Sequence, residues 1–203
     1  MSDLAFRPMR LDASDLTAFG ECFARSGSPR ARENLEWQYL YNPPQRLFVN
    51  LAVRSEGSFA AIYASLPIYV RIGGRVQLAL QSLDTLTDVE FRGKGLFVKL
   101  AKTTFDRASK DGAAFVYGFP NGNSAHGFFQ KLAWPLRTGY LARRLKIGRY
   151  VPDFPLALSS MPKPPRGLAL EAINRFDDRF TRLWQRFAQG VGVGVERDGR
   201  YLD

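Results

Sequence analysis

The chain has 203 residues and a net charge of +10, and 45% of its residues are hydrophobic. This length and hydrophobic content suffice for one packed domain, or for one domain and part of a second. It has no apolar run of about 18 residues and no apolar stretch behind Met1, so we expect a cytoplasmic protein with no membrane contact. Its single cysteine excludes an internal disulfide, and with a single histidine it also excludes a cysteine- or histidine-rich metal site. The positive charge is spread along the chain without a dense Lys/Arg run, which favours a phosphate-bearing ligand over nucleic acid.

The first part of the chain alternates between strand-like and helix-like patterns. Strands are expected over residues 4–10, 48–54, 59–68 and 75–87, and helices over 15–24 and 31–39. Asp12 or Ser14 is placed to cap the first helix. Gly73-Gly74 tolerates the positive φ of a tight turn, so the strands on either side should form a hairpin.

The strand expected over residues 75–87 changes phase along its length. Val76, Leu78 and Leu80 share one parity, whereas Leu83 and Leu86 break it. A shift of one residue inside a strand indicates a β-bulge. We therefore expect this strand to be kinked.

The next part of the chain completes an α/β (α+β) domain that ends near Tyr150, so that residues 1–150 form one unit. Its expected elements are a helix over 96–110, a short buried strand over 113–118, a helix over 124–132 and final strands within 134–146. Residues 151–166 are rich in proline and are interpreted as a linker.

Residues 167–203 echo the start of the chain. A strand-like segment over 168–173 precedes an amphipathic helix over 177–189, as in the first strand and helix. The positions of Leu16, Phe19 and Phe23 correspond to those of Phe180, Leu183 and Phe187. We interpret this region as the start of a second, related module that is cut short, or as a C-terminal extension. The alternative is chance similarity between two amphipathic segments.

The loop Arg92-Gly-Lys-Gly-Leu-Phe97 follows the long strand and opens a helix. Its glycines let the backbone approach a ligand closely. The free N–H groups of the helix start form an anion site, and Arg92 and Lys94 add positive charge. The spacing matches neither a Walker loop nor a dinucleotide-binding fingerprint. The loop therefore predicts a cradle for a diphosphate.

The segment Val89-Glu-Phe-Arg-Gly-Lys-Gly-Leu-Phe-Val-Lys-Leu100 resembles the acyl-CoA motif of the GNAT acetyltransferases. Arg92 and Gly95 match it, whereas Phe97 stands where that family usually has Gly or Ala. The Gly-Leu-Phe form resembles one branch, which also carries a Trp-containing segment and a Gly-Phe-Pro-Asn segment, here within 35–39 and 117–121. The resemblance covers residues 4–149. It implies the GNAT fold, a mixed and mostly antiparallel sheet with a splayed central strand pair and flanking helices.

The resemblance also implies a function and a site. The chain would move an acetyl group from acetyl-CoA to an amine by direct attack, relying on positioning and on backbone N–H groups that stabilise the oxyanion. The diphosphate would lie on Arg92, Gly93, Lys94, Gly95, Leu96 and Phe97. The pantetheine arm would contact the main chain of Thr85, Leu86 and Thr87, and Asn121 or Asn123.

The catalytic groups are less clearly marked. Phe129 stands where many GNAT enzymes have the tyrosine that protonates the leaving thiolate. His126 could replace it, or could simply be a surface or capping residue. Asp84 is a candidate general base, with a structural role as the alternative.

Trp37, Tyr39 and Tyr63 could line the acceptor pocket, or could be ordinary core and rim aromatics. Cys22 is expected to be a small buried hydrophobe. The acceptor would be a small amine, an amino sugar or a protein amine, and the chain could act as a homodimer or as one of two tandem modules. Two other functions stay open. One is a FemABX-like aminoacyl transferase, against which the intact loop argues, and the other is a non-catalytic CoA-binding module, which Phe129 motivates.

Overall fold

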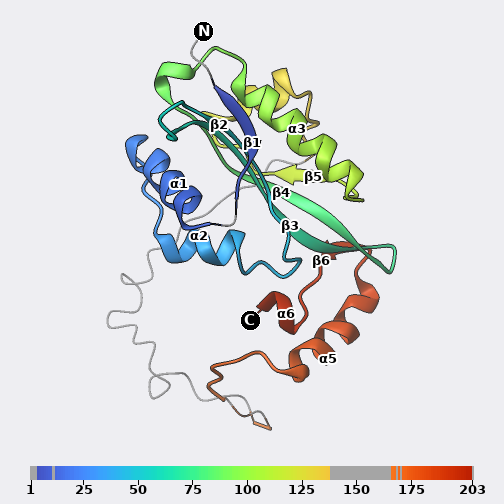
Figure 1. Cartoon of the computed structure of the whole chain (residues 1–203). Coiled ribbons are helices and arrows are strands. Elements are labelled where there is room, and N and C mark those ends of the chain that lie inside the picture. The colour runs from blue at the N-terminus through green and yellow to red at the C-terminus, as the bar shows by residue number, and fades with distance from the viewer. Residues whose placement is uncertain (1–3, 11, 138–165, 168, 170, 203) are drawn as a thin grey trace, which may run out of the picture.

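The computed structural model describes residues 4–10, 12–137, 166, 167, 169 and 171–202. Its centre is a mixed, mostly antiparallel sheet, shown in Figure 1, with the strand order β1-β2-β3-β4-β5 and a further strand, β6, paired with β3. The strands are β1 (Ala5–Pro8), β2 (Phe48–Val53), β3 (Phe59–Ile72), β4 (Arg75–Thr87), β5 (Val116–Gly118) and β6 (Val193–Val195). The expected α/β class and the helices on both sheet faces are confirmed.

Two helices, α1 (Ala13–Arg25) and α2 (Arg32–Tyr39), cover one face of the sheet. Asp12 caps α1, since its side chain accepts a hydrogen bond from the backbone N–H of Asp15. The buried side chains of both helices form one cluster with apolar residues of β2 and β3. Cys22 belongs to this cluster and is 1% exposed, as expected for a small buried hydrophobe.

The β3–β4 hairpin turns at Gly73 and Gly74, whose φ values of 53° and 81° are positive, as the sequence predicts. β3 runs four residues further than expected, to Ile72, because the hairpin continues past the end of β2. The β-bulge is also confirmed. Ile62 pairs with Leu86 but Ala64 pairs with Leu83, which leaves two residues of β4 opposite Tyr63.

The opposite face of the sheet is covered by α3 (Leu96–Lys110), whose bounds are those predicted. Its apolar side packs on Tyr63 and on small residues of β2 and β3. A buried hydrogen bond of 2.7 Å from Asn50 Nδ2 to Thr104 Oγ1 ties β2 to this helix. Each buried polar group thereby satisfies the other.

β5 runs parallel to β4, pairing Leu80 with Val116 and Ser82 with Gly118. The helix expected over 124–132 is confirmed for residues 125–131, of which Gly127–Lys131 form the π-helix η2. The final strands expected within 134–146 are not formed by residues 134–137, and the rest of that range lies outside the described residues. No helix in the described ranges is long and apolar enough to cross a membrane.

The C-terminal segment carries α5 (Asp178–Phe187), β6 and α6 (Gly199–Leu202). α5 confirms the expected helix, and Asp177 caps it. The expected strand over 168–173 is wrong for residues 169 and 171–173, which form none. β6 pairs antiparallel with β3, and Arg71 binds both carboxylate oxygens of Glu196 at 3.1 and 2.8 Å. The expected linker lies outside the described residues up to 165, and the second module stays a prediction.

Candidate functional site

The glycine loop forms an open helix start. Gly93 and Gly95 have φ values of 76° and 73°, and a Cβ at either position would meet no atom within 4 Å. Gly95 is the N-cap of α3, and no side chain caps this helix or adds an acid to its first turn. By contrast, the described helices α1 and α5 each have an aspartate cap and an acidic first turn. The N-terminus of α3 therefore keeps donors and positive potential available to an anion.

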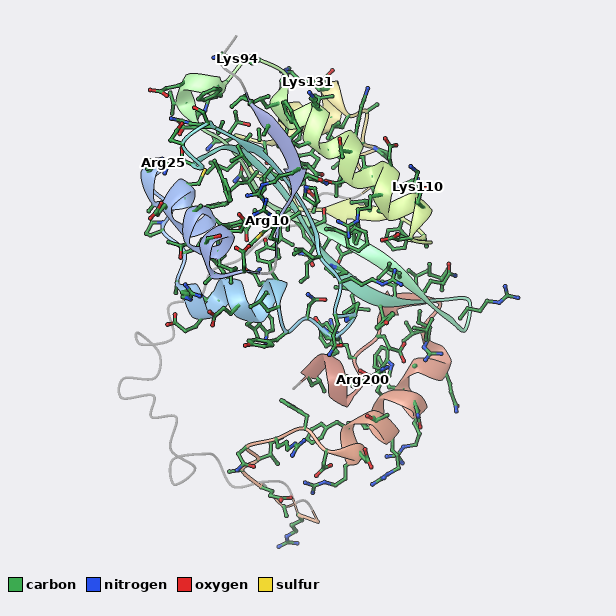
Figure 2. The ribbon with its side chains drawn as sticks, in the orientation of Figure 1. Arg10, Arg25, Lys94, Lys110, Lys131 and Arg200 are labelled. Carbon is green, nitrogen blue, oxygen red and sulfur yellow. The ribbon has the colours of Figure 1, made fainter. Side chains whose placement is uncertain are left out.

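The charged residues of the loop flank this helix start. Figure 2 shows Lys94 near the start of α3 and Lys110 at the other end of this helix. The Lys94 ammonium lies 4.5 Å from the centre of the Phe91 ring, while Arg92 is exposed and donates through Nε to the Thr87 carbonyl at 3.3 Å. Both cations therefore lie at the surface beside the open N–H groups.

Leu96 and Phe97 contribute differently from the glycines. Leu96 is buried, and the Phe97 ring packs 5.7 Å from Tyr63 and 5.2 Å from Phe128 between ring centres. A Cβ at Gly127 would lie 2.9 Å from this ring. The two side chains thus anchor α3 in the core. Of Leu96 and Phe97, only the backbone N–H groups remain at the helix start for a ligand.

The last residues of β4 form a strand edge beyond the end of β5. The parallel pairing ends at Ser82 and Gly118, whereas β4 continues to Thr87. Leu86 pairs with Ile62, and Asp88 N–H bonds to the Ala60 carbonyl, so by alternation the main chain of Thr85 and Thr87 faces away from β3. Among the described residues this edge leaves the main chain of Thr85 and the N–H of Thr87 open to an extended ligand, while the Thr87 carbonyl already accepts a hydrogen bond from Arg92.

Asp84 occupies the bulge with a φ of 47°, a left-handed conformation that is uncommon outside glycine. Its carboxylate is buried on the α1–α2 face. Oδ1 accepts a hydrogen bond from Arg30 and Oδ2 accepts one from the Tyr39 hydroxyl at 2.9 Å. Burial raises the pKa of the Asp84 carboxyl. The positive charge of Arg30 and the hydrogen bonds from Tyr39 and Arg30 lower this pKa again, but only in part. Burial and the neighbouring carboxylate raise the pKa of Tyr39 as well.

The three aromatics expected near an acceptor lie in different surroundings. Tyr39 is 2% exposed and contacts Asp84. Tyr63 is fully buried, and its hydroxyl is 2.9 Å from Ser82 Oγ. Trp37 is 60% exposed on α2. The structure thus brings Tyr39 to the bulge, leaves Trp37 at the surface and places Tyr63 under α3.

The turn after β5 holds the remaining predicted residues. Asn121 Oδ1 accepts from the backbone N–H groups of Asn123 and Ser124 at 3.0 and 3.1 Å, so Asn121 fixes the turn. Asn123 and His126 are exposed, and Phe129 is half-buried. The structure therefore leaves Asn123 and His126 accessible from solvent.

Arg30 is the site residue that sequence reasoning missed. It lies in a segment that reads only as a helix break, and nothing local marks its contact with a residue 54 positions further on. Within the described part of the chain, no group of three or more His, Cys, Asp or Glu side chains could hold a metal ion. A hollow of about 530 Å³ lies at the other end of α3, beside Arg46, Arg107 and Asp111, and includes none of these site residues.

Comparison with known proteins identifies the family of the chain. The model of the acetyltransferase (GNAT) domain matches residues 13–136, more than half of the chain. The search of the curated proteins found no match to this chain. An acetyltransferase from Trypanosoma brucei has a TM-score of 0.57 and 17% identity, over 70% of this chain and 100% of that one. Glucosamine-6-phosphate N-acetyltransferase from Arabidopsis thaliana has a TM-score of 0.54 and 14% identity, over 71% and 99%.

A transcriptional regulator from Bacillus halodurans has a TM-score of 0.56 and 12% identity, over 70% of this chain and 100% of that one. At these identities the solved structures establish the fold alone. The family model covers β3, β4 and α3, and with them the bulge between β3 and β4 and the glycine loop that precedes α3. The family that the sequence resembles is thereby confirmed, and the chain belongs to the GNAT acetyltransferase family.

Proposed function

We propose that this chain transfers an acetyl group from acetyl-CoA to an amine acceptor by direct attack. The observation that carries the proposal is the uncapped start of α3, where Gly93 and Gly95 adopt positive φ beside open space and no acid lies in the first turn. An anionic diphosphate fits this start, because free N–H groups and the helix dipole both favour negative charge there.

The neighbouring residues fit the rest of the ligand. Arg92 and Lys94 would add charge beside the diphosphate, and the open edge at Thr85–Thr87 would pair with the amides of the pantetheine arm. Acetyl-CoA, when bound, supplies the acyl group as a thioester. The chain's part is then to hold the acceptor amine against that edge and to exclude competing geometries.

Proton transfer in this proposal involves Asp84 and His126. The Asp84 side chain is 1% exposed, so in this proposal it takes the proton of the acceptor through a relaying water. His126 is exposed and carries an imidazole that can donate to the leaving thiolate, which Phe129 cannot do. Asp84→Ala and His126→Ala should each reduce acyl transfer, and two fully active variants would remove both assignments.

Calorimetric titration with acetyl-CoA is the first test, with free CoA and a tRNA mixture as controls. We expect a dissociation constant in the micromolar range, about −8 kcal/mol, for acetyl-CoA and no specific binding of tRNA. Acetylation of a panel of amines, followed by release of the free thiol, then tests the reaction. A folded chain that binds no acetyl-CoA would refute the proposal, and specific tRNA binding would favour an aminoacyl transferase.

A further inference from the structure

Arg30 is fixed in place from below while part of its guanidinium faces solvent. It lies between α1 and α2, and its guanidinium carbon is 5.2 Å from the centre of the Phe23 ring. Its side chain is 41% exposed, whereas that of its partner Asp84 is 1% exposed. The buried carboxylate and the aromatic ring therefore hold an arginine whose remaining surface is accessible.

In the Arg30–Asp84 pair, both carboxylate oxygens are engaged, and only the arginine has donors left unused. Asp84 uses one oxygen for Arg30 and the other for Tyr39. A guanidinium has five N–H donors, and Asp84 is the hydrogen-bond acceptor that the described residues provide for Arg30. The buried carboxylate is thus engaged by protein groups, while the arginine retains donors toward solvent.

The position of Arg30 places those donors beside the proposed site. Asp84 is the residue of β4 that directly precedes the open edge at Thr85–Thr87, and it sits in the bulge. Arg30 reaches the bulge from the α1–α2 face, while α3 covers the other face of the sheet. Arg30, which is partly exposed, therefore contacts the residue next to the open edge from the sheet face that α1 and α2 cover.

We infer that Arg30 forms a subsite for an acidic group of the acceptor, so that the substrates of this chain are amines that also carry a carboxylate or a phosphate. This inference rests on the proposed function and deepens it. A planar guanidinium binds either group through two parallel hydrogen bonds. Because Asp84 and Phe23 already fix the arginine, little further conformational freedom is lost when an acid binds.

The competing explanation is that the Arg30–Asp84 pair only closes the segment between α1 and α2. A purely structural pair predicts that loss of Arg30 lowers stability and the rate for every acceptor alike. An acid-binding subsite predicts a change in selectivity between acceptors with and without the acidic group. The two explanations therefore differ in a ratio that does not depend on the amount of folded protein.

The experiment compares pairs of acceptors that share an amine and differ in the acidic group. One pair is an α-amino acid and its amide, and the other is aminoethyl phosphate and ethanolamine, so that the two arms separate carboxylate from phosphate. We expect the wild-type chain to prefer the acidic member of at least one pair by about 10-fold or more in kcat/KM, mostly through KM.

Three variants are measured on the same pairs. Arg30→Met removes the donors, and Arg30→Met combined with Asp84→Asn removes them without leaving a buried unpaired charge. Both should lose the preference. Arg32→Met is the matched control, because Arg32 is a half-exposed arginine two residues away that pairs with Glu36, and it should keep the preference.

The outcomes separate this inference from the proposed function. Failure to bind acetyl-CoA in the calorimetric titration refutes the proposed function itself. Normal acetyl-CoA binding with equal use of acidic and neutral amines, or with no acidic amine acetylated, overturns only the subsite. A preference that survives in both Arg30 variants overturns it as well.

Discussion

The two ends of α3 offer a matched test of the diphosphate cradle. Gly95 at its start and Gly112 just beyond its end have φ values of 73° and 79°, and a Cβ at either would meet no atom within 4 Å. Gly95→Ala and Gly112→Ala therefore impose the same backbone strain and no clash. They differ in what lies beside them, since only Gly95 borders the proposed diphosphate site.

The expected loss of stability is small and equal. A left-handed conformation costs a non-glycine residue about 1–2 kcal/mol, and the lower entropy of the unfolded alanine chain returns about 0.4–1 kcal/mol. Each variant should lose about 1 kcal/mol, or about 2–4 °C in Tm for a chain of this size. Neither variant should unfold at 25 °C, because typical domains have about 5–15 kcal/mol of stability.

Binding of acetyl-CoA should separate the two variants. The methyl group at position 95 would fill the space in which the phosphate oxygens approach the backbone, so we expect affinity to fall at least about 10-fold, or about 1.4 kcal/mol. Gly112→Ala should bind as the wild type does. Thermal denaturation and calorimetric titration of the three proteins measure both quantities. Equal affinities in the two variants would remove Gly95 from the site and refute the assignment of the loop.

Three further predictions concern the fold. Burial raises the pKa of Asp15, but hydrogen bonds from Arg7 and a backbone N–H outweigh it and lower the pKa below 3.8. Asp15→Asn should therefore lose about 2 kcal/mol at pH 7, and in urea denaturation the gap should shrink below about pH 4; a constant gap would contradict this. Burial raises the pKa of Cys22 to about 11, so a thiol reagent at pH 8 should label it only after unfolding, whereas rapid labelling of the native chain would disprove its burial. Arg71→Met should free Glu196 and speed limited proteolysis of residues 171–202 about 10-fold while acetyl-CoA binding stays normal; unchanged proteolysis would show that this pair does not hold the segment.

Features with a local cause could be predicted from the sequence. The change of phase between Leu80 and Leu83 predicted the bulge, because strand periodicity fixes which face each residue occupies. Asp12 was one of the two residues expected to cap the first helix and does cap α1, and the glycine pair predicted the hairpin, since capping and positive φ depend on the residues themselves. The start of α3 followed from the glycine loop for the same reason.

Features that depend on distant contacts could not be predicted. Arg30 reaches Asp84 only because the fold brings the α1–α2 connection against the bulge. Tyr63 was a candidate acceptor residue, but Phe97 and Phe105 lie against it and help to bury it under α3. Nothing in the local pattern indicated whether the ring of Phe97 would face a ligand or the core.

The first residue of the π-helix, Gly127, is another such case. Gly127 lies where any Cβ would meet the Phe97 ring at 2.9 Å, so the two positions are fitted to each other. Gly127 provides the space that the Phe97 ring fills. A coupling of this kind between a loop and a later turn is visible only once both are packed.

β6 has a consequence for how the chain behaves among its own copies. β2 leaves β3 at Ser65, while β3 continues to Ile72, and β6 pairs with Val70, Arg71 and Ile72. A bare strand edge presents unpaired N–H and C=O groups that can template pairing with another molecule, and a short edge strand is a common protection against this. Since β6 spans only three residues, Val193–Val195, it covers that edge while offering little of its own. A shortened chain that lacks β6 should therefore self-associate through β3, even though every residue of the glycine loop and the bulge would be intact.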